Sequence, residues 1–84
     1  MKLLIGADKG GFAVKEAIAD HLRSQNLEFE DIGTLSMDAP VAFTKIASIA
    51  GRQISSGEAK RAILLCGTGM GMAITANSRF WLLR

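Results

Sequence analysis

The residues of this chain that are best suited to chemistry lie where an apolar run meets a loop rich in glycine. Cys66 ends the run and is followed by Gly67, Thr68, Gly69, Met70 and Gly71. Glycines let a backbone approach a ligand closely, and loop amides can hold a phosphate or a developing oxyanion. A thiolate beside such amides would act as a base or a nucleophile. The alternative is a buried cysteine that ends a core strand, because cysteine often behaves as a small hydrophobic residue.

Three known loop motifs fail here on spacing. A Walker phosphate loop needs Lys and then Ser or Thr after its last glycine, but Met72 follows Gly71. A dinucleotide fingerprint needs a third glycine at the position of Met72, and a cysteine-based phosphatase loop needs an arginine there. Cys66 and His21 are far apart, so no metal site is predicted. We interpret Met70 and Met72 as packing residues, and His21 as a surface residue in mid-helix.

A second candidate loop, over residues 6–11, also contains glycines and follows an apolar run. Its polar members are Asp8 and Lys9, which could orient hydroxyl groups or a phosphate. The alternative is that Asp8 caps the next helix while Lys9 is a solvated side chain. The residue types alone leave both interpretations open.

Apolar patterns predict the elements that must position these loops. Short apolar or alternating runs predict strands over 2–5, 27–32 and 62–66, the second of them half exposed and near a sheet edge. Apolar residues four apart predict an amphipathic helix over 12–25. Its inward face is formed by Val14, Ala17, Ile18 and Leu22, and its outward face by Lys15, Glu16, Asp20 and Arg23.

The second half of the chain continues the alternation. A helix is predicted to have Pro40 in its first turn and to close at Gly57. After the glycine loop, a short helix is predicted over 72–77, and residues 79–84 form either a fourth strand or an apolar tail. Strands alternating with helices predict one α/β domain over 1–84 with a parallel sheet. Ligands bind beyond the carboxyl ends of parallel strands, where both candidate loops fall.

Composition excludes several classes of protein. The chain has 84 residues, a formal net charge of +2 and one cysteine. Its basic residues are scattered, so no nucleic-acid partner is expected. No apolar stretch has the length of a membrane span or a signal segment, and we expect a cytoplasmic protein without membrane contact. A domain this small buries a smaller fraction of its surface on folding than a larger domain does, so a partner chain would stabilise it and we expect a homo-oligomer.

The motifs resemble the sugar-phosphate isomerase family that includes ribose 5-phosphate isomerase B and galactose 6-phosphate isomerase. The resemblance covers residues 2–12, 31–34, 56–59, 62–74 and 76–77 in order and spacing, and it is most specific over 66–71. It implies a Rossmann-like three-layer sandwich, incomplete here at three to four strands. It also implies that a sugar phosphate is isomerised between aldose and ketose, without a metal or other cofactor.

The resemblance implies roles for individual residues. Cys66 would be the base that moves a proton between C1 and C2 of a substrate such as ribose 5-phosphate, through an enediolate. Thr68 would act with the loop amides to hold the developing charge. The residues expected to bind substrate are Asp8, Lys9, Gly67, Gly69, Met70 and Gly71.

The chain also departs from the family pattern. Lys9 stands where histidine is usual, and Ala39 replaces a usual tyrosine. After Asn77 the pattern of the family stops, and about the second half of a typical member is absent. That half carries the ring-opening histidine, the phosphate-binding arginines and a dimerisation helix. We therefore expect a truncated domain, and the alternative to an active isomerase is an inactive remnant or a small-molecule-binding module.

Overall fold

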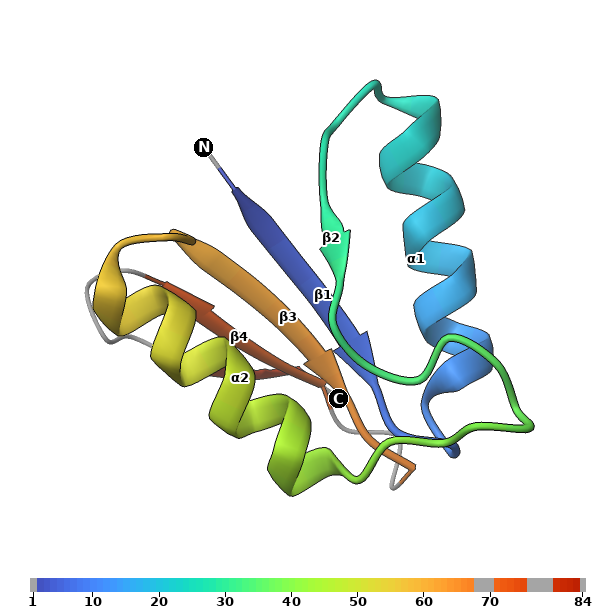
Figure 1. Ribbon diagram of the computed structural model, residues 1–84. Helices are drawn as coiled ribbons and strands as arrows, with labels where there is room; N and C mark the ends of the chain where they lie inside the picture. Colours follow the sequence, from blue (N-terminus) through green and yellow to red (C-terminus); the bar gives the residue numbers. More distant parts are fainter. Residues whose placement is uncertain (1, 68–70, 76–79, 84) are drawn as a thin grey trace.

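The computed structural model describes residues 2–67, 71–75 and 80–83. Within these residues the chain forms five strands and two helices in an α/β arrangement (Figure 1). The elements, in chain order, are β1 (Leu3–Ala7), α1 (Phe12–Ser24), β2 (Glu30–Asp31), α2 (Phe43–Ser56), β3 (Arg61–Leu65), β4 (Gly71–Thr75) and β5 (Phe80–Leu83).

The strands form one mixed sheet in the order β2-β1-β3-β4-β5. β1 pairs in parallel with both β2 and β3, whereas β4 and β5 run antiparallel to their neighbours. The chain leaves β1 toward β2 and then crosses back to β3. Because such crossovers are right-handed, α1 and α2 cover opposite faces of the sheet (Figure 1). This confirms the predicted three-layer α/β fold.

The core lies where α2 packs against the two central strands. Leu4 of β1 and Leu64 of β3 are fully buried against Ile46 and Ala50 of α2. These strands are continuous apolar runs because helices cover both of their faces. Gly57, with φ of 85°, ends α2 as predicted, since this left-handed conformation suits glycine.

The predicted inward face of α1 is wrong in part. Val14 is 55% exposed and Ala17 is also exposed, whereas Lys15 is buried at 1% exposure together with Ala19 and Leu22. Periodicity alone treats a lysine as polar and outward. Here an acidic partner on β2 allows the ammonium group to be buried.

Two predicted boundaries were also wrong. β2 is only two residues long, because the chain is irregular over 27–29 and Leu27 is 52% exposed there. Its predicted place at the sheet edge is confirmed. Pro40 precedes α2 by three residues instead of entering its first turn. The buried hydroxyl of Thr34 accepts a hydrogen bond from the Val41 N–H at 2.9 Å, which holds this segment in an extended path until the helix begins.

The helix predicted over 72–77 is contradicted by β4. Of the residues predicted to be helical, the structure describes 72–75. They belong to β4 and pair with β3 in the register Ala62↔Ile74 and Leu64↔Met72. A single helical turn gains few hydrogen bonds for the residues that it orders, while a strand completes the ladder of an exposed sheet edge. Residues 80–83 form β5, so the strand interpretation of this segment is confirmed and the sheet has one strand more than expected.

The buried ammonium group of Lys15 joins α1 to the sheet edge. Its Nζ lies 2.6 Å from Asp31 Oδ2, 2.8 Å from Glu16 Oε2 and 4.5 Å from the centroid of the Phe12 ring. Burial by itself lowers the pKa of Lys15, but the hydrogen bonds and charges of Asp31 and Glu16 outweigh it and raise that pKa above 10.5. The hydrogen bond from Lys15 in turn lowers the pKa of Glu16.

Replacing Lys15 by methionine should lower the free energy of unfolding by about 3 kcal/mol, because Asp31 then loses the cation that compensates its largely buried charge. Lys45→Met makes the same change at an exposed site on α2 and should alter the free energy by less than about 0.5 kcal/mol. Urea denaturation followed by circular dichroism measures both values. Equal effects of the two substitutions would contradict the assigned role of Lys15.

The assigned role of Lys15 also predicts how the stability of the chain depends on pH. Folding raises the pKa of Lys15. Its ammonium group therefore contributes fully to the free energy of unfolding below pH 10.5, and this contribution is lost as the pH rises through the pKa of the folded state. The stability of the unaltered chain should therefore fall more steeply above pH 10.5 than that of Lys15→Met. Parallel curves for the two proteins would exclude this titration as a source of stability.

Candidate active site

The parallel pairing of β1 with β3 brings the two candidate loops together. Ala7 and Leu65, the last residues of the two strands, face each other in the register. Asp8 and Cys66 therefore start neighbouring loops at the carboxyl edge of the sheet, as the topology predicts. Cys66 is half-buried there, and Lys9 is exposed.

Asp8 makes three hydrogen bonds, two of which reach the residues on either side of Cys66. Its backbone N–H donates to the carbonyl oxygen of Leu65 at 3.2 Å. Its side-chain Oδ1 accepts from the Gly11 N–H at 2.9 Å, and Oδ2 accepts from the Gly67 N–H at 3.3 Å. The carboxylate thus closes the turn that leads into α1 and also holds the loop after β3. The interpretation that Asp8 caps the helix is wrong, because Gly11 is the N-cap residue and α1 has no side-chain cap bond.

The loops touch through glycine backbone. A Cβ on Gly10 would lie 2.4 Å from Gly67 Cα, and a Cβ on Gly11 would lie 2.7 Å from the Leu65 carbonyl oxygen. No side chain fits between backbones at this distance, so the approach depends on glycine at both positions. It also brings the N-terminus of α1 beside the end of β3.

Two of the predicted site residues, Gly67 and Gly71, take part in contacts of the fold itself. Gly71 begins β4 and faces Leu65 in the register. The Gly67 N–H, expected to face a substrate oxyanion, is directed at Asp8. Thr68, Gly69 and Met70 lie outside the described residues, so their assigned roles stay predictions, as do those of Cys66 and Lys9.

A groove runs beside these loops. It has a volume of about 420 Å³ and is lined by Asp8, Lys9 and Gly10 on one side and by residues 40–43 on the other. The Thr34–Val41 hydrogen bond described above fixes the second wall. Sequence reasoning missed this wall, although a threonine directly after the Gly33 turn was a signal that a hydroxyl could bond to nearby backbone.

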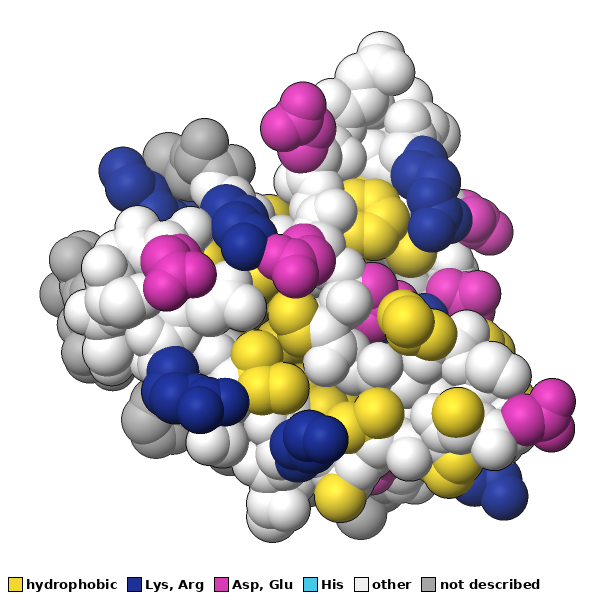
Figure 2. Space-filling model, in the orientation of Figure 1, with side chains coloured by type: hydrophobic (Ala, Val, Ile, Leu, Met, Phe, Trp, Pro, Cys, Tyr) yellow, Lys and Arg dark blue, Asp and Glu magenta, His cyan; other side chains and the backbone are white. Residues whose placement is uncertain are grey.

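A mostly apolar hollow of about 600 Å³ adjoins the groove. It shares Lys9 and Gly10 with the groove and adds Phe12, Ala13 and Met37. Figure 2 shows hydrophobic side chains (yellow) gathered on this face over the segment between β2 and α2, with Lys and Arg side chains (dark blue) at the rim. Leu35 and Met37 in that segment are 67% and 48% exposed. The site therefore combines an exposed cation with apolar walls.

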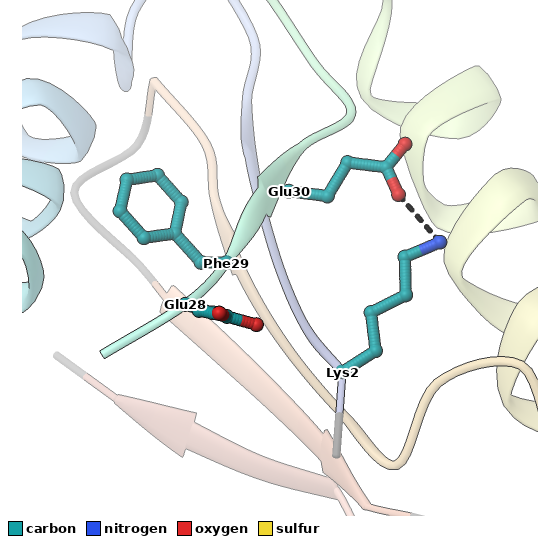
Figure 3. A pocket seen from close by; sticks show the side chains of 4 residues that line it. All are labelled: Lys2, Glu28, Phe29 and Glu30. Carbon is teal, nitrogen blue, oxygen red and sulfur yellow. Dashed lines mark ion pairs between the residues drawn. The ribbon is translucent and has the colours of Figure 1, made fainter. Parts of the chain in front are cut away.

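Another hollow, of about 330 Å³, lies near the amino end of β1 and so away from Cys66 (Figure 3). Lys2 crosses it to Glu30, with Nζ 2.5 Å from Oε1, and the same Nζ donates to Gln53 Oε1 at 3.0 Å. The Lys2 ammonium thus links β1 to β2 and α2. Both members of the ion pair are exposed, at 38% and 48%, so the pair adds little to stability.

His21 is exposed near the C-terminal end of α1, far along the chain from either loop. In the part of the chain that the structure covers, no three His, Cys, Asp or Glu residues are grouped as metal ligands would be. Neither described helix is long and apolar enough to cross a membrane.

Comparison with known proteins finds one family and several relatives. The model of the Ribose/Galactose Isomerase family matches residues 3–79. The 4-deoxy-4-sulfo-D-erythrose isomerase of Clostridium sp. (strain MSTE9) is 53% identical over 77 residues, covering 92% of this chain and 48% of that protein. The D-erythrulose-4-phosphate isomerase 2 of Mycolicibacterium smegmatis is 39% identical over 79 residues, covering 92% and 52%.

A solved structure agrees with these matches. The ribose-5-phosphate isomerase B of Clostridium thermocellum superposes with a TM-score of 0.70 at 36% sequence identity, over 80% of this chain and 45% of that one. The chain therefore spans about half the length of the relatives that it matches.

The contact between the loops predicts that replacing glycine by alanine changes the free energy of unfolding in opposite directions at Gly10 and at Gly51. Gly10→Ala should lower the free energy of unfolding by roughly 2 kcal/mol, because the new Cβ overlaps Gly67 and must push the Cys66 loop away. Gly51→Ala places its Cβ in open space on α2 and should raise the free energy by roughly 0.5–1 kcal/mol. Chemical denaturation measures both, and a change of the same sign would contradict the contact.

Proposed function

The chain belongs to the Ribose/Galactose Isomerase family, and from this premise we propose that it takes part in aldose–ketose isomerisation of a small sugar that carries a terminal anion. The observation that carries the proposal is the meeting of the Asp8 and Cys66 loops at the carboxyl edge of the sheet. A half-buried thiol, an exposed lysine and a groove are thereby placed at one end of the fold.

The proposed chemistry is a proton transfer with no net loss of atoms. The Cys66 thiolate removes the proton from C2 of the open-chain aldose, and the electron pair moves onto the carbonyl to form an enediolate. The carbon-bound proton returns to C1, the hydroxyl proton passes from the C2 oxygen to the C1 oxygen, and the C2 oxygen becomes the carbonyl of the ketose. Such a transfer needs a base together with donors for the enediolate oxygen. We assign the donor role to Thr68 and to the amides of Gly69 and Gly71.

The exposed ammonium group of Lys9 is the proposed contact for the anionic end of the sugar. Lys9 lines both the groove and the apolar hollow, so a ligand in either space meets its charge. The names of two relatives carry a sulfonate or a phosphate on a four-carbon sugar. A lysine is a point charge without a fixed fork geometry and therefore accepts either anion. We accordingly include four-carbon sugars beside ribose 5-phosphate among the candidate substrates.

Binding of such a sugar without turnover is the second candidate function. It is favoured by the hydrogen bond between the Gly67 N–H and Asp8, because this amide is directed at a carboxylate and is not presented to a ligand. The expected homo-oligomer also stays a prediction, and sedimentation would test it.

The experiment is an isomerase assay on the purified, folded chain with ribose 5-phosphate, D-erythrulose 4-phosphate and 4-deoxy-4-sulfo-D-erythrose. Cys66→Ala should lower the rate at least about 100-fold, because it removes the base. Turnover in D2O should place deuterium on the carbon that receives the proton, since a thiol proton exchanges with solvent. Calorimetric titration with the same sugars measures binding.

Three results decide between the candidates. Loss of turnover in Cys66→Ala, with binding retained, supports the isomerase. Full turnover in that variant contradicts the assigned base. Binding without turnover by the unaltered chain supports the binding module. Glu58→Ala, a change at an exposed residue away from both loops, is the control variant and should leave rate and binding unchanged.

A further inference from the structure

We propose that Asp8 is a positioning residue that holds Cys66 in place from both sides, a role that rests on the proposed function of Cys66. The residues before and after Cys66 are each bonded to Asp8. The Leu65 carbonyl accepts from the Asp8 N–H at 3.2 Å, and the Gly67 N–H donates to Asp8 Oδ2 at 3.3 Å. The backbone of Cys66 is therefore held between two hydrogen bonds to a single residue.

The carboxylate of Asp8 is itself anchored at the start of α1. Its Oδ1 accepts from the Gly11 N–H at 2.9 Å, and the Gly11 carbonyl accepts from the Lys15 N–H at 3.0 Å in the first turn of the helix. Lys15 is in turn buried against Asp31 of β2. The backbone of Cys66 is thus positioned relative to helix α1.

Aspartate suits this role better than its close analogues. Both of its oxygens accept, and hydrogen bonds to a charged acceptor are stronger than neutral ones. Asparagine at position 8 would offer one oxygen and one amino group, so it would present a donor to either the Gly11 or the Gly67 N–H. Alanine would remove both side-chain bonds. The remaining lone pairs of the carboxylate leave the expected contact between Asp8 and substrate possible at the same time.

The test is amide hydrogen exchange at Gly67, measured by NMR in the full chain. Asp8→Ala should make this amide exchange roughly tenfold faster, because the amide loses a bond to a charged acceptor. Gly57, whose N–H donates to the Ile54 carbonyl at the end of α2, is the internal reference and should not change. Asp38→Ala removes another acidic side chain, an exposed one, and should leave both amides unchanged.

A second measurement follows Cys66 itself. Alkylation of its thiol by the uncharged reagent iodoacetamide, at one fixed pH, should be at least about threefold faster in Asp8→Ala than in Asp38→Ala. The loop that carries Cys66 has then lost one of its two bonds. Where the unaltered chain turns over a sugar, Asp8→Asn should lower kcat more than it raises KM.

Two results would overturn the inference. One is unchanged exchange at Gly67 in folded Asp8→Ala, and the other is an equal increase at Gly67 and Gly57, which would indicate general destabilisation. If Asp8→Ala does not fold, Asp8→Asn is expected to show the same pattern with a smaller change. The exchange and alkylation measurements need no turnover, so a chain without isomerase activity can refute the proposed function while the role of Asp8 stands or falls separately.

Discussion

The parallel register between β1 and β3 is the constraint on which the site depends. It aligns all five residues of each strand and ends with Ala7 opposite Leu65. Because both strands run in the same direction, each releases its loop at the same edge. Two loops that are 59 residues apart at Asp8 and Gly67 thereby come within hydrogen-bonding distance. A shift of one residue would move Leu64 of β3 away from its position beside Leu4 against α2, so the core itself protects the register.

Close contact between the loops imposes a second constraint, which is chemical and not topological. The chain cannot place side chains where Gly10 meets Gly67 or where Gly11 meets the Leu65 carbonyl. The glycine-rich composition of both loops therefore has a structural cause besides any approach to a ligand. With the side chains absent, backbone N–H groups and one carboxylate hold the edge together. Such bonds to a charged acceptor are among the stronger hydrogen bonds in proteins.

Elements that rest on an apolar pattern repeated over many residues could be predicted from the sequence, whereas contacts between individual residues could not. The continuous apolar run before Cys66 and the apolar spacing of the first helix repeat over many residues, so they placed β3 and α1 in the right part of the chain. The helix predicted from Pro40 to Gly57 was also found, but α2 begins only at Phe43. The burial of Lys15 depended on one acidic residue of β2, which periodicity does not register. The run after Gly71 is short and apolar, and such a run suits a helical turn and a strand equally, so only pairing with β3 decided it. The bond from Gly67 to Asp8 leaves no trace in the local pattern.

The carboxylate of Asp8 limits where the proposed enediolate can develop its charge. Two like charges about 4 Å apart near a protein surface repel by about 4 kcal/mol. An enediolate oxygen at the Gly67 amide would therefore be repelled by the negative charge of the Asp8 carboxylate. The same amide cannot be fully shared between two acceptors. The proposed reaction would therefore be favoured where the oxygen lies away from the Asp8 carboxylate and toward the donors proposed after Cys66. In the proposed reaction Asp8 therefore holds the base in position without supporting the charge that the base creates, and Lys9 is left to contact the anionic end of the sugar.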